Sequence, residues 1–380
     1  SYSYIKNILN LSKKYKVSFK PLKANPIDIF WSNDRNISPN SDINVHPLKY
    51  AGISANKKIE NLCIYLKKLN TEAYIINQPD SLAWLLNIRG MDLKHTPIIL
   101  SRAIIFNNGE IYLFIDSSRI DKKIKNHFKN NIKIYPEKNI ISEIIKISKK
   151  KSKILADPDS VSYALIQFIK DKKNTLIETK CPIEKMKAIK NTIEIKGTFS
   201  AHLKDGVALS KFLYWIHKSK ITNNSELLAS NTIDNLRSKQ RNFICTSFET
   251  ISGFASNGAI VHYRVTKNSN KKFANNNLFL CDSGGQYLEG TTDVTRTIAI
   301  GKPTKSMKNH FTIVLKGHIA LASAIFPYGT TGNDLDLLAR LPLWKNNMNY
   351  GHGTGHGVGS CLSVHEGPHR ISKGSFVPLE

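Results

Sequence analysis

The sequence predicts an α/β (α+β) protein with more than one domain, for three reasons. Segments with helical hydrophobic periodicity alternate with short apolar, strand-like segments along most of the chain. The 380 residues exceed the usual size of one domain. Hydrophobic residues make up 41% and charged residues 22%, a balance typical of globular proteins, and no apolar run is long enough to cross a bilayer, so we expect no membrane partner.

Residues 1–45 are predicted to be the remnant of a first N-terminal domain together with a linker. A short helical pattern is followed by KPLKANPIDIFW and then by the polar stretch SNDRNISPNSDINVHP, whose composition is typical of a linker. The first residues, SYSYIKNILN, contain neither an initiating Met nor the apolar region of a signal peptide. We therefore expect a fragment or a processed chain.

Residues 46–180 are predicted to form a middle α/β domain. An amphipathic helix, NKKIENLCIYLKKLN, leads to the apolar strand AYIIN, and a helix-like segment, DSLAWLLNIRG, comes next. The turn Asn107-Asn108-Gly109 inside AIIFNNGEIYLFID predicts a β-hairpin. A helix around Ile140–Lys149 and the strand KILADP complete this domain near Lys180.

Residues 181–380 are predicted to form a further domain, which opens at Cys181-Pro182. We expect one long helix from Ile183 to Lys218, with Gly197 and Gly206 as weak points. Four strand-like segments follow: FICTSFETISG, AIVHYRV, LFLCDSGG and TRTIAI. Two helices, HFTIVLKGHIALASAIF and NDLDLLARLPLW, precede a histidine-rich stretch, GHGTGHGVGSCLSVHEGPHR.

The cysteines indicate a reducing compartment. Their number is odd, and they are scattered without a CxxC pair, which argues against both a disulfide framework and a zinc knuckle. We expect reduced thiols in a cytoplasmic protein. The five residues are Cys63, Cys181, Cys245, Cys281 and Cys361.

The formal net charge of +26 raises the question of a nucleic-acid partner. Lysine, asparagine and isoleucine crowd the polar stretches together, as in KNHFKNNIKIYPEKNIISEIIKISKKK, a bias that AT-rich coding produces. The lysines are spread along the chain, with few arginines and no interleaved aromatic residues on which bases could stack. We therefore expect scattered basic residues and no nucleic-acid partner.

The histidine-rich stretch does not fit a helical zinc site. His352 and His356 have the four-residue spacing of HExxH, but the glutamate of that motif is absent. The five alternating glycines from Gly351 to Gly359 each cost a helix about 1 kcal/mol relative to alanine. An extended backbone is expected instead, with His352, Thr354 and His356 on one face.

Two aspartates accompany the histidines as candidate ligands. Asp282 ends an apolar strand, Asp293 lies in the next strand-like segment, and a turn near Glu289-Gly290 would make the two strands neighbours. The register is open, and Asp282 taken alone also fits a turn-capping role. Two carboxylates with one or more imidazoles suit Mn²⁺, Co²⁺, Fe²⁺ or Zn²⁺ in a hydrolytic site. Three ligands are too few for two metal ions.

Three motifs resemble those of one family in their residues, their order and their spacing. NGAIVHYR, CDSGGQYLEGTTDVTRT and GHGTGHGVGSCLSVHEGP are similar to the motifs of the aminopeptidase P (Xaa-Pro aminopeptidase) family, metallopeptidases with the pita-bread fold. Upstream, DSLAWLLNIRGMD and YLFIDSSRI resemble the middle, creatinase-type domain of the three-domain cytosolic type, and NPIDIFW with KYAGIS resembles its junction with the first domain. The resemblance covers essentially the whole chain and implies truncation at both ends, with an incomplete pita-bread domain.

The resemblance also implies a metal site and its cofactors. Asp282, Asp293 and His356 match ligands of a dinuclear site for divalent ions, Mn²⁺ first and Zn²⁺ or Co²⁺ as alternatives. The family completes this site with two glutamates, which would lie beyond residue 380. Glu380 itself precedes those strands in the family and is not expected to be a ligand.

Three further histidines match active-site positions of the family. The resemblance implies that His262 contacts the substrate and that His352 and His365 hydrogen-bond the peptide or assist proton transfer. His369 matches no functional position. The usual HY-x-P pattern is broken by Arg264, which affects the conformation of that loop.

The function implied is metal-dependent removal of the N-terminal residue from peptides with proline in second position. We expect peptide substrates, a possible homodimer, and no activity from the truncated chain by itself. The alternatives are a sister hydrolase on the same fold, such as an Xaa-Pro dipeptidase (prolidase) or a creatinase, and a non-catalytic pita-bread module that binds protein partners. Intact aspartates and His356 disfavour the binding module, and the middle-domain motifs disfavour the prolidase.

Overall fold

The structure is a computed structural model that describes residues 1–20, 22, 25–31, 39–128, 131–148, 152–171 and 174–380. These residues form two compact units. The first, here called the N-terminal unit, comprises Ser1–Pro47, Ile53–Leu93 and Ile98–Ile183. The second, the C-terminal unit, comprises Leu48–Gly52, Lys94–Pro97 and Glu184–Glu380. Residues 32–38 of the predicted linker lie outside the described residues.

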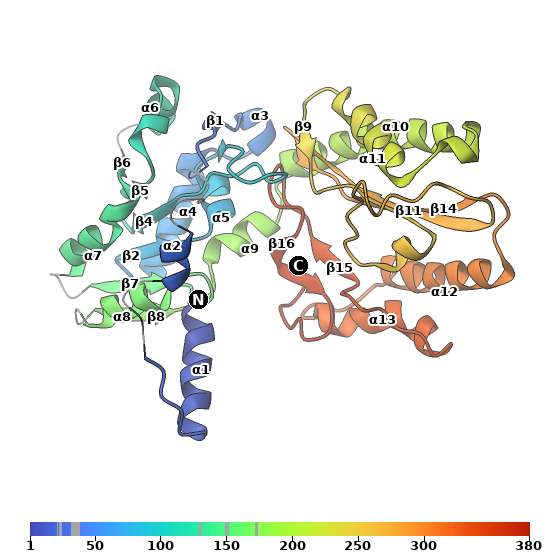
Figure 1. Ribbon diagram of the computed structural model, residues 1–380. Helices are drawn as coiled ribbons and strands as arrows, with labels where there is room; N and C mark the ends of the chain where they lie inside the picture. The colour runs from blue at the N-terminus through green and yellow to red at the C-terminus, as the bar shows by residue number, and fades with distance from the viewer. Residues whose placement is uncertain (21, 23–24, 32–38, 129–130, 149–151, 172–173) are drawn as a thin grey trace. The chain divides into compact units, whose positions relative to one another are not determined.

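The N-terminal unit contains a mixed sheet of six strands (Figure 1). They are β2 (Ala73–Ile76), β4 (Arg102–Phe106), β5 (Ile111–Phe114), β6 (Ile132–Tyr135), β7 (Lys153–Ala156) and β8 (Thr175–Glu178), in the order β6-β5-β4-β2-β7-β8. β2 runs antiparallel to β4 and parallel to β7. All four residues of β2 are buried, which explains why its sequence is a continuous apolar run.

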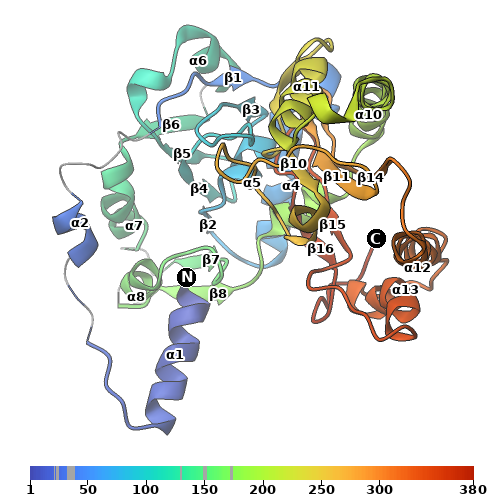
Figure 2. The same ribbon diagram turned by 45° about the vertical axis from the view of Figure 1, so that its right-hand side comes forward.

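Helices of the N-terminal unit complete its core. The helices α7 and α8 pack their apolar faces against Ile75, Ile104 and Ile154 of the sheet. α1 begins beside α8, where the Tyr2 amide donates a hydrogen bond to the carbonyl of Val161 at 2.9 Å (Figure 2). The helices are α1 (Tyr2–Lys14), α2 (Pro26–Phe30), α4 (Ala55–Lys68), α5 (Pro79–Leu85), α6 (Lys122–Phe128), α7 (Ile140–Ser148) and α8 (Tyr163–Asp171), and β1 (Asn44–Val45) pairs with β3 (Ile88–Arg89).

The predicted hairpin and the helix NKKIENLCIYLKKLN are confirmed, whereas DSLAWLLNIRG is helical only as far as Leu85 and ends in β3. β4 and β5 pair antiparallel, and Gly109 between them has a φ of 92°, a backbone conformation that glycine adopts without strain. α4 begins after Ser54, whose side chain accepts a hydrogen bond from the Lys57 amide and so caps the helix. Its buried residues Leu62 and Leu66 form the apolar face that the sequence pattern predicts.

The long helix predicted from Ile183 to Lys218 is wrong in one respect, because two helices occupy this range. α9 (Pro182–Ala188) ends before α10 (Thr192–Lys218) begins. Asn191 interrupts them: its side chain accepts hydrogen bonds from the amides of Ile193 and Glu194, and the Glu194 carboxylate accepts one from the Asn191 amide. The helix continues through Gly197, where the absence of a side chain allows close packing against the Glu289 carbonyl oxygen. A Cβ at this position would lie 2.3 Å from that oxygen.

The C-terminal unit contains two three-stranded sheets and one strand pair. β11 (Asn277–Ser283) lies between β10 (Ile251–Phe254) and β14 (Val294–Ile300). β12 (Gly285–Tyr287) lies between β13 (Gly290–Thr291) and β9 (Phe243–Thr246), and β15 (Gly355–Gly357) pairs with β16 (Glu366–Ile371). The apolar side chains of α10, α11 (Glu226–Ser238), β10 and β11 form one core cluster.

Two more helices follow β14. α12 (Lys305–Ala322) and α13 (Gly332–Trp344) lie side by side (Figure 1), and Gly317 permits their close approach, since a Cβ there would lie 2.3 Å from the Ala339 carbonyl oxygen. The short α3 (Leu48–Ala51) also belongs to this unit. Among the described residues, no helix has both the length and the apolar character that a membrane crossing requires.

The strand predicted for AIVHYRV is wrong. A 3₁₀ helix, Ala255–Ala259, is followed by a turn in which the Tyr263 amide donates to the carbonyl of Ile260. His262 has a φ of 56°, which lies outside the range of an extended strand. Just before this turn, Gly253 and Gly258 pack closely, since a Cβ on Gly253 would lie 2.8 Å from the Cα of Gly258.

Candidate metal centre

The neighbouring strands β11 and β14 position the two candidate aspartates. Asp282 is directly opposite Thr295 in this antiparallel pair, which confirms that the two strands are neighbours. Asp293 immediately precedes β14 and stands two residues before Thr295. Because side chains alternate between faces with a period of two, Asp282 and Asp293 point to the same side of the sheet.

Asp282 has a carboxylate oxygen that suits a cation. Its Oδ1 is buried and has no hydrogen-bond partner among the described residues. Burial raises the pKa of Asp282, a hydrogen bond from Thr295 lowers it, and the charge of Asp293 raises it again. A buried acceptor without a donor is costly for a protein, and a divalent cation between two carboxylates would remove that cost.

His356 brings a nitrogen to the same place. Its Nε2 lies 3.2 Å from Oδ2 of Asp293, and its Nδ1 lies 2.8 Å from the carbonyl oxygen of Gly357. Since a carbonyl and a carboxylate only accept, Nδ1 carries a proton, and Nε2 carries a second one when it donates to Asp293. Without that second proton, Nε2 can bind a cation. The hydrogen bond with Asp293 is the main cause that raises the pKa of His356. A ring fixed by a carbonyl on one nitrogen is the usual arrangement of a metal-binding histidine.

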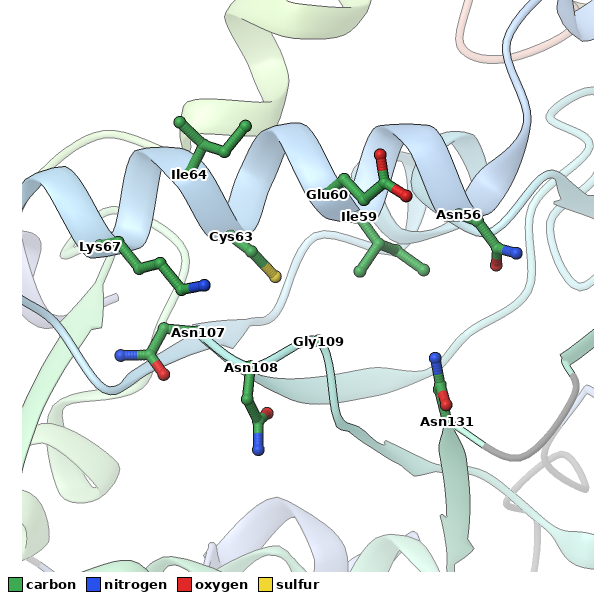
Figure 3. Close-up of a pocket in the computed structure, with 10 residues that line it drawn as sticks. All are labelled: Asn56, Ile59, Glu60, Cys63, Ile64, Lys67, Asn107, Asn108, Gly109 and Asn131. Carbon is green, nitrogen blue, oxygen red and sulfur yellow. The ribbon is translucent and has the colours of Figure 1, made fainter.

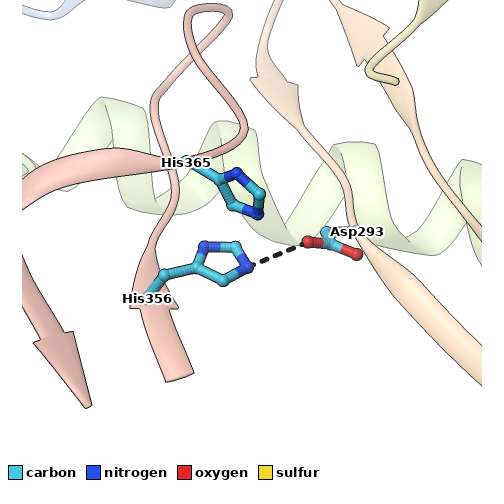
Figure 4. Close-up of side chains that lie close together, drawn as sticks. All are labelled: Asp293, His356 and His365. Carbon is cyan, nitrogen blue, oxygen red and sulfur yellow. Dashed lines mark ion pairs between the residues drawn. The ribbon is translucent and has the colours of Figure 1, made fainter. Parts of the chain in front are cut away.

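His365 completes the cluster (Figure 4). Its ring lies edge-on to that of His356, with 4.3 Å between the ring centroids. One potential ligand atom each from Asp293, His356 and His365 lies within 4.8 Å of the others. His365 is exposed, but partial desolvation, followed by the neighbouring His356, lowers the pKa of its imidazole, which favours the neutral ring.

His262 and His352 differ in their relation to this cluster. The His262 ring faces His365, with 6.2 Å between the centroids. His352 lies outside β15, which spans only Gly355–Gly357, so the extended face predicted for His352, Thr354 and His356 is shorter than expected. The ring of His352 is 5.2 Å from that of Tyr350, and among the described contacts none joins it to the other five candidates.

Sequence reasoning missed a buried carboxylate beside His365. Glu366 pairs with Lys187 at 3.1 Å and with Lys190 at 2.5 Å, and the side chains of Glu366 and Lys187 are each 1% exposed. In the strand register, Glu366 is opposite Gly357, the neighbour of His356. The ion pairs therefore attach both histidine-bearing strands to the α9–α10 corner. No local signal could reveal them, because the lysines lie more than 170 residues away in sequence.

Gln286 was also missed. Its buried side chain donates hydrogen bonds to the carbonyls of Leu362 and His95, and it accepts one from the hydroxyl of Thr291. Thr291 stands two residues before Asp293, and Leu362 stands three before His365. Gln286 thus connects the two segments that carry Asp293 and His365; a glutamine within the glycine-containing motif CDSGGQYLEG is the sequence signal that could have indicated it.

A cavity of about 400 Å³ in the N-terminal unit carries no comparable chemistry (Figure 3). It lies between α4 and the β4–β5 turn. Burial raises the pKa of its one thiol, Cys63, which therefore stays protonated and unreactive. Its lining is Asn56, Ile59, Glu60, Cys63, Ile64, Lys67, Asn107, Asn108, Gly109 and Asn131.

Two known protein families match the chain in succession. Residues 34–194 match the Creatinase/Prolidase N-terminal domain, and residues 199–380 match Metallopeptidase family M24. The second match contains every candidate site residue described above.

Individual relatives agree with these matches. A probable Xaa-Pro aminopeptidase P of Paracoccidioides brasiliensis is 38% identical over 361 residues, which are 91% of this chain and 58% of the relative. Aminopeptidase P2 of Arabidopsis thaliana is 37% identical and covers 94% of this chain and 55% of its own length. The crystal structure of an X-prolyl aminopeptidase from Caenorhabditis elegans superposes with a TM-score of 0.93 at 35% identity, covering 100% of this chain and 63% of its own. The chain thus spans about three fifths of the length of these relatives.

Proposed function

Since this chain belongs to metallopeptidase family M24, with a creatinase/prolidase-type domain ahead of the M24 domain, we propose that its protein is an Xaa-Pro aminopeptidase. It would hydrolyse the bond between an N-terminal residue and a proline in second position. The observation that supports this most is the contact of Asp293 with His356, beside the buried, partnerless oxygen of Asp282. These residues stand in the motifs by which the chain resembles the family.

The donor set fits divalent metal ions. Asp282 and Asp293 supply oxygens, and His356 supplies a nitrogen whose ring is already oriented by the Gly357 carbonyl. The Caenorhabditis elegans structure is described as having a di-nuclear active site. We propose that this protein also binds two divalent ions, with Mn²⁺ as the first candidate. Further carboxylates from outside these 380 residues would complete the two coordination shells. When bound, such ions lower the pKa of a water and polarise a carbonyl.

The remaining residues would bind and orient the peptide and move protons. His365, whose lowered pKa favours the neutral ring, can accept a proton from the attacking water and return it to the proline nitrogen. His262 faces His365 and would contact the scissile carbonyl, where a donor stabilises the developing oxyanion. For His352 the support is the family resemblance alone, and we propose that it binds the peptide.

We further propose peptide substrates, a cytoplasmic location and a homodimer, with neither nucleic acid nor membrane as partner. The cytoplasmic location is supported by the Caenorhabditis elegans relative, which is described as a cytosolic enzyme. For the domains we propose a remnant of a first domain and linker in residues 1–45, a middle domain in 46–180 and the peptidase domain in 181–380. Limited proteolysis with N-terminal sequencing of the products would test these boundaries.

A cleavage assay tests the proposed function. The complete gene product, freed of metal and then supplied with Mn²⁺, Zn²⁺ or Co²⁺, should release alanine from Ala-Pro-Pro but not from Ala-Ala-Pro. A chelator should stop the release. Cleavage confined to the dipeptide Ala-Pro would indicate a prolidase instead, and the absence of metal-dependent cleavage of any of these peptides would favour a binding module.

A further inference from the structure

Glu226 is a fully buried carboxylate to which the reaction described above gives no role. It is the first residue of α11 and is 0% exposed. Its Oε1 accepts hydrogen bonds from the Phe254 amide at 2.7 Å and from Nδ2 of Asn257 at 3.0 Å. Its Oε2 accepts from the hydroxyl of Tyr263 at 3.1 Å and from the Lys271 amide at 2.9 Å. Four donors therefore converge on one side chain.

These donors all belong to one loop, residues 254–271. Phe254 is the last residue of β10, and Lys271 is at the far end of the loop, so Glu226 closes it at both ends. Asn257 and Tyr263 hold its middle, and Nδ2 of Asn257 also donates to the Tyr263 hydroxyl at 2.8 Å. Hydrogen bonds to a charged acceptor are about twice as strong as those between neutral groups. Glu226 thus fixes the conformation of a segment that has little regular structure.

His262 depends on this loop for its orientation. It is exposed, so packing does not hold its ring, and its φ of 56° is a conformation that non-glycine residues rarely adopt. Its neighbour Tyr263 is buried and bonded to Glu226. A left-handed backbone persists only where its surroundings enforce it. For His262 that enforcement comes through Tyr263 and the two closed ends of the loop.

We infer that Glu226 is a positioning residue: its carboxylate fixes the 254–271 loop so that the imidazole of His262 faces His365 beside Asp293 and His356. Only the part of His262 in peptide cleavage rests on the proposed function; the anchoring of the loop does not. Glu226 would touch neither the peptide nor the metal ions, and it acts through His262.

A double-mutant cycle in the complete gene product tests this. Glu226→Gln keeps the size of the side chain but replaces one acceptor oxygen by an NH₂ group, which cannot accept from an amide or hydroxyl. We expect kcat for Ala-Pro-Pro to fall about 10- to 100-fold, the usual effect of losing a group that orients a reactive side chain. In a His262→Ala background, Glu226→Gln should lower kcat by less than about two-fold further.

Glu289→Gln serves as the matched control. Glu289 is also buried, accepts hydrogen bonds from Asn242 and Ser200, and forms an ion pair with Lys204. It does not contact the 254–271 loop. Its loss should lower stability without a change in kcat. Equal effects of Glu226→Gln in the wild-type and His262→Ala backgrounds, or an unchanged kcat, would overturn the inference, since a merely structural role predicts additive losses.

If the protein cleaves no Xaa-Pro peptide, the proposed function is contradicted but the anchoring of the loop is not. Two measurements test the anchoring without any cleavage assay. Glu226→Gln should speed hydrogen exchange in residues 254–271 while leaving β11 and β14 unchanged. It should also change the rate at which diethyl pyrocarbonate modifies His262, measured by mass spectrometry. If Glu226→Gln fails to fold, Tyr263→Phe can be used instead, because it removes one of the donors to Glu226. It should change hydrogen exchange in residues 254–271 and the modification rate of His262 in the same direction, but by less. Exchange that rises uniformly, or not at all, would overturn the anchoring role.

Discussion

The N-terminal unit and the C-terminal unit bury different kinds of groups within their sheets. In the first, β2 is apolar and buried at every position, and it joins a cluster formed by apolar side chains of α7 and α8. In the second, carboxylates are buried in the helices, turns and strands around the candidate site: Asp205, Glu226, Glu289 and Glu366. The buried carboxylates of the N-terminal unit, Asp92, Glu143 and Asp157, lie outside its strands. Each of these needs a cation or several donors, because an unpaired buried charge is costly.

Burial therefore serves different purposes in the two units: mainly stability in the first, and also the placement of the candidate site residues in the second. Apolar burial stabilises the N-terminal unit without placing any reactive group. In the C-terminal unit, Glu226 holds the loop that carries His262, and Glu366 holds the strand pair next to His356 and His365. Substitutions near the candidate site should therefore change metal binding and catalysis, whereas substitutions in the apolar core of the N-terminal unit should change stability.

The largest effect is expected at the metal ligands. Asp293→Asn or His356→Ala in the complete gene product should lower kcat/KM for Ala-Pro-Pro by about 10³-fold or more, since each removes a group that we propose to hold the ions and with them the activated water. The far-ultraviolet circular dichroism and the melting temperature of the metal-free protein should change little. A variant that keeps a tenth of the activity would contradict the assigned ligands.

The next effect concerns the buried ion pair of the C-terminal unit. Nε and Nη2 of Arg237 lie 2.7 and 2.9 Å from the carboxylate oxygens of Asp205, and Arg237 is 0% exposed. Arg237→Met should lower the free energy of unfolding by about 3–5 kcal/mol, because it leaves Asp205 buried without its cation. Adding Asp205→Leu should recover much of the loss in urea denaturation. A loss below about 1 kcal/mol for Arg237→Met alone would contradict the importance of buried charges here.

The matching change in the N-terminal unit is Ile75→Ala. Ile75 is 1% exposed in the middle of β2, so the substitution should cost about 3 kcal/mol in unfolding free energy through lost burial and a cavity. Ile75→Val is the control and should cost about 1 kcal/mol. Metal affinity and kcat of the folded protein should be unchanged; a large loss of either would show that the two units are not functionally separate.

A smaller, pH-dependent effect is expected from His46 in the N-terminal unit. Burial, together with the charges of Arg89 and Lys58, lowers its pKa to about 2. Below the unfolded-state pKa of about 6.5, the unfolded chain binds a proton that the folded chain does not. Stability should therefore fall with pH below about 6.5, by about 1.4 kcal/mol per pH unit from this residue. In His46→Gln the slope of unfolding free energy against pH between about 5 and 6.5 should be smaller by most of that amount; an unchanged slope would contradict the burial of a neutral imidazole.

The sequence predicted the parts of the fold that local patterns determine. The fold class is confirmed by the matches to the Creatinase/Prolidase N-terminal domain and to family M24. The turn at Gly109, the helix α4 and the pairing of β11 with β14 follow from residues near each other in sequence. The break between α9 and α10 at Asn191 was not predicted. The helical pattern runs on through this position, and the pattern alone does not show whether the capping box of Asn191 and Glu194 starts a new helix there.

The candidate site was predictable in its residues but not in its geometry. The motifs identified Asp282, Asp293, His356 and His365, whereas the register that puts the aspartates on one face required the paired strand. The turn at His262 was missed because its cause, Glu226, lies 36 residues earlier and acts through hydrogen bonds that no periodicity reveals. The carboxylate of Glu366 and its lysines were missed for the same reason.

Titration of Mn²⁺ into the metal-free complete gene product, followed by the electron paramagnetic resonance of free Mn²⁺, tests the metal centre most directly. We predict saturable binding of two ions per chain at neutral pH. Asp293→Asn should lose most of this binding, because its carboxylate contacts Nε2 of His356 and lies close enough to Asp282 to raise the pKa of that carboxyl, while Glu289→Gln should keep it. Binding of equal affinity and stoichiometry in the wild type and in Asp293→Asn would contradict the metal centre.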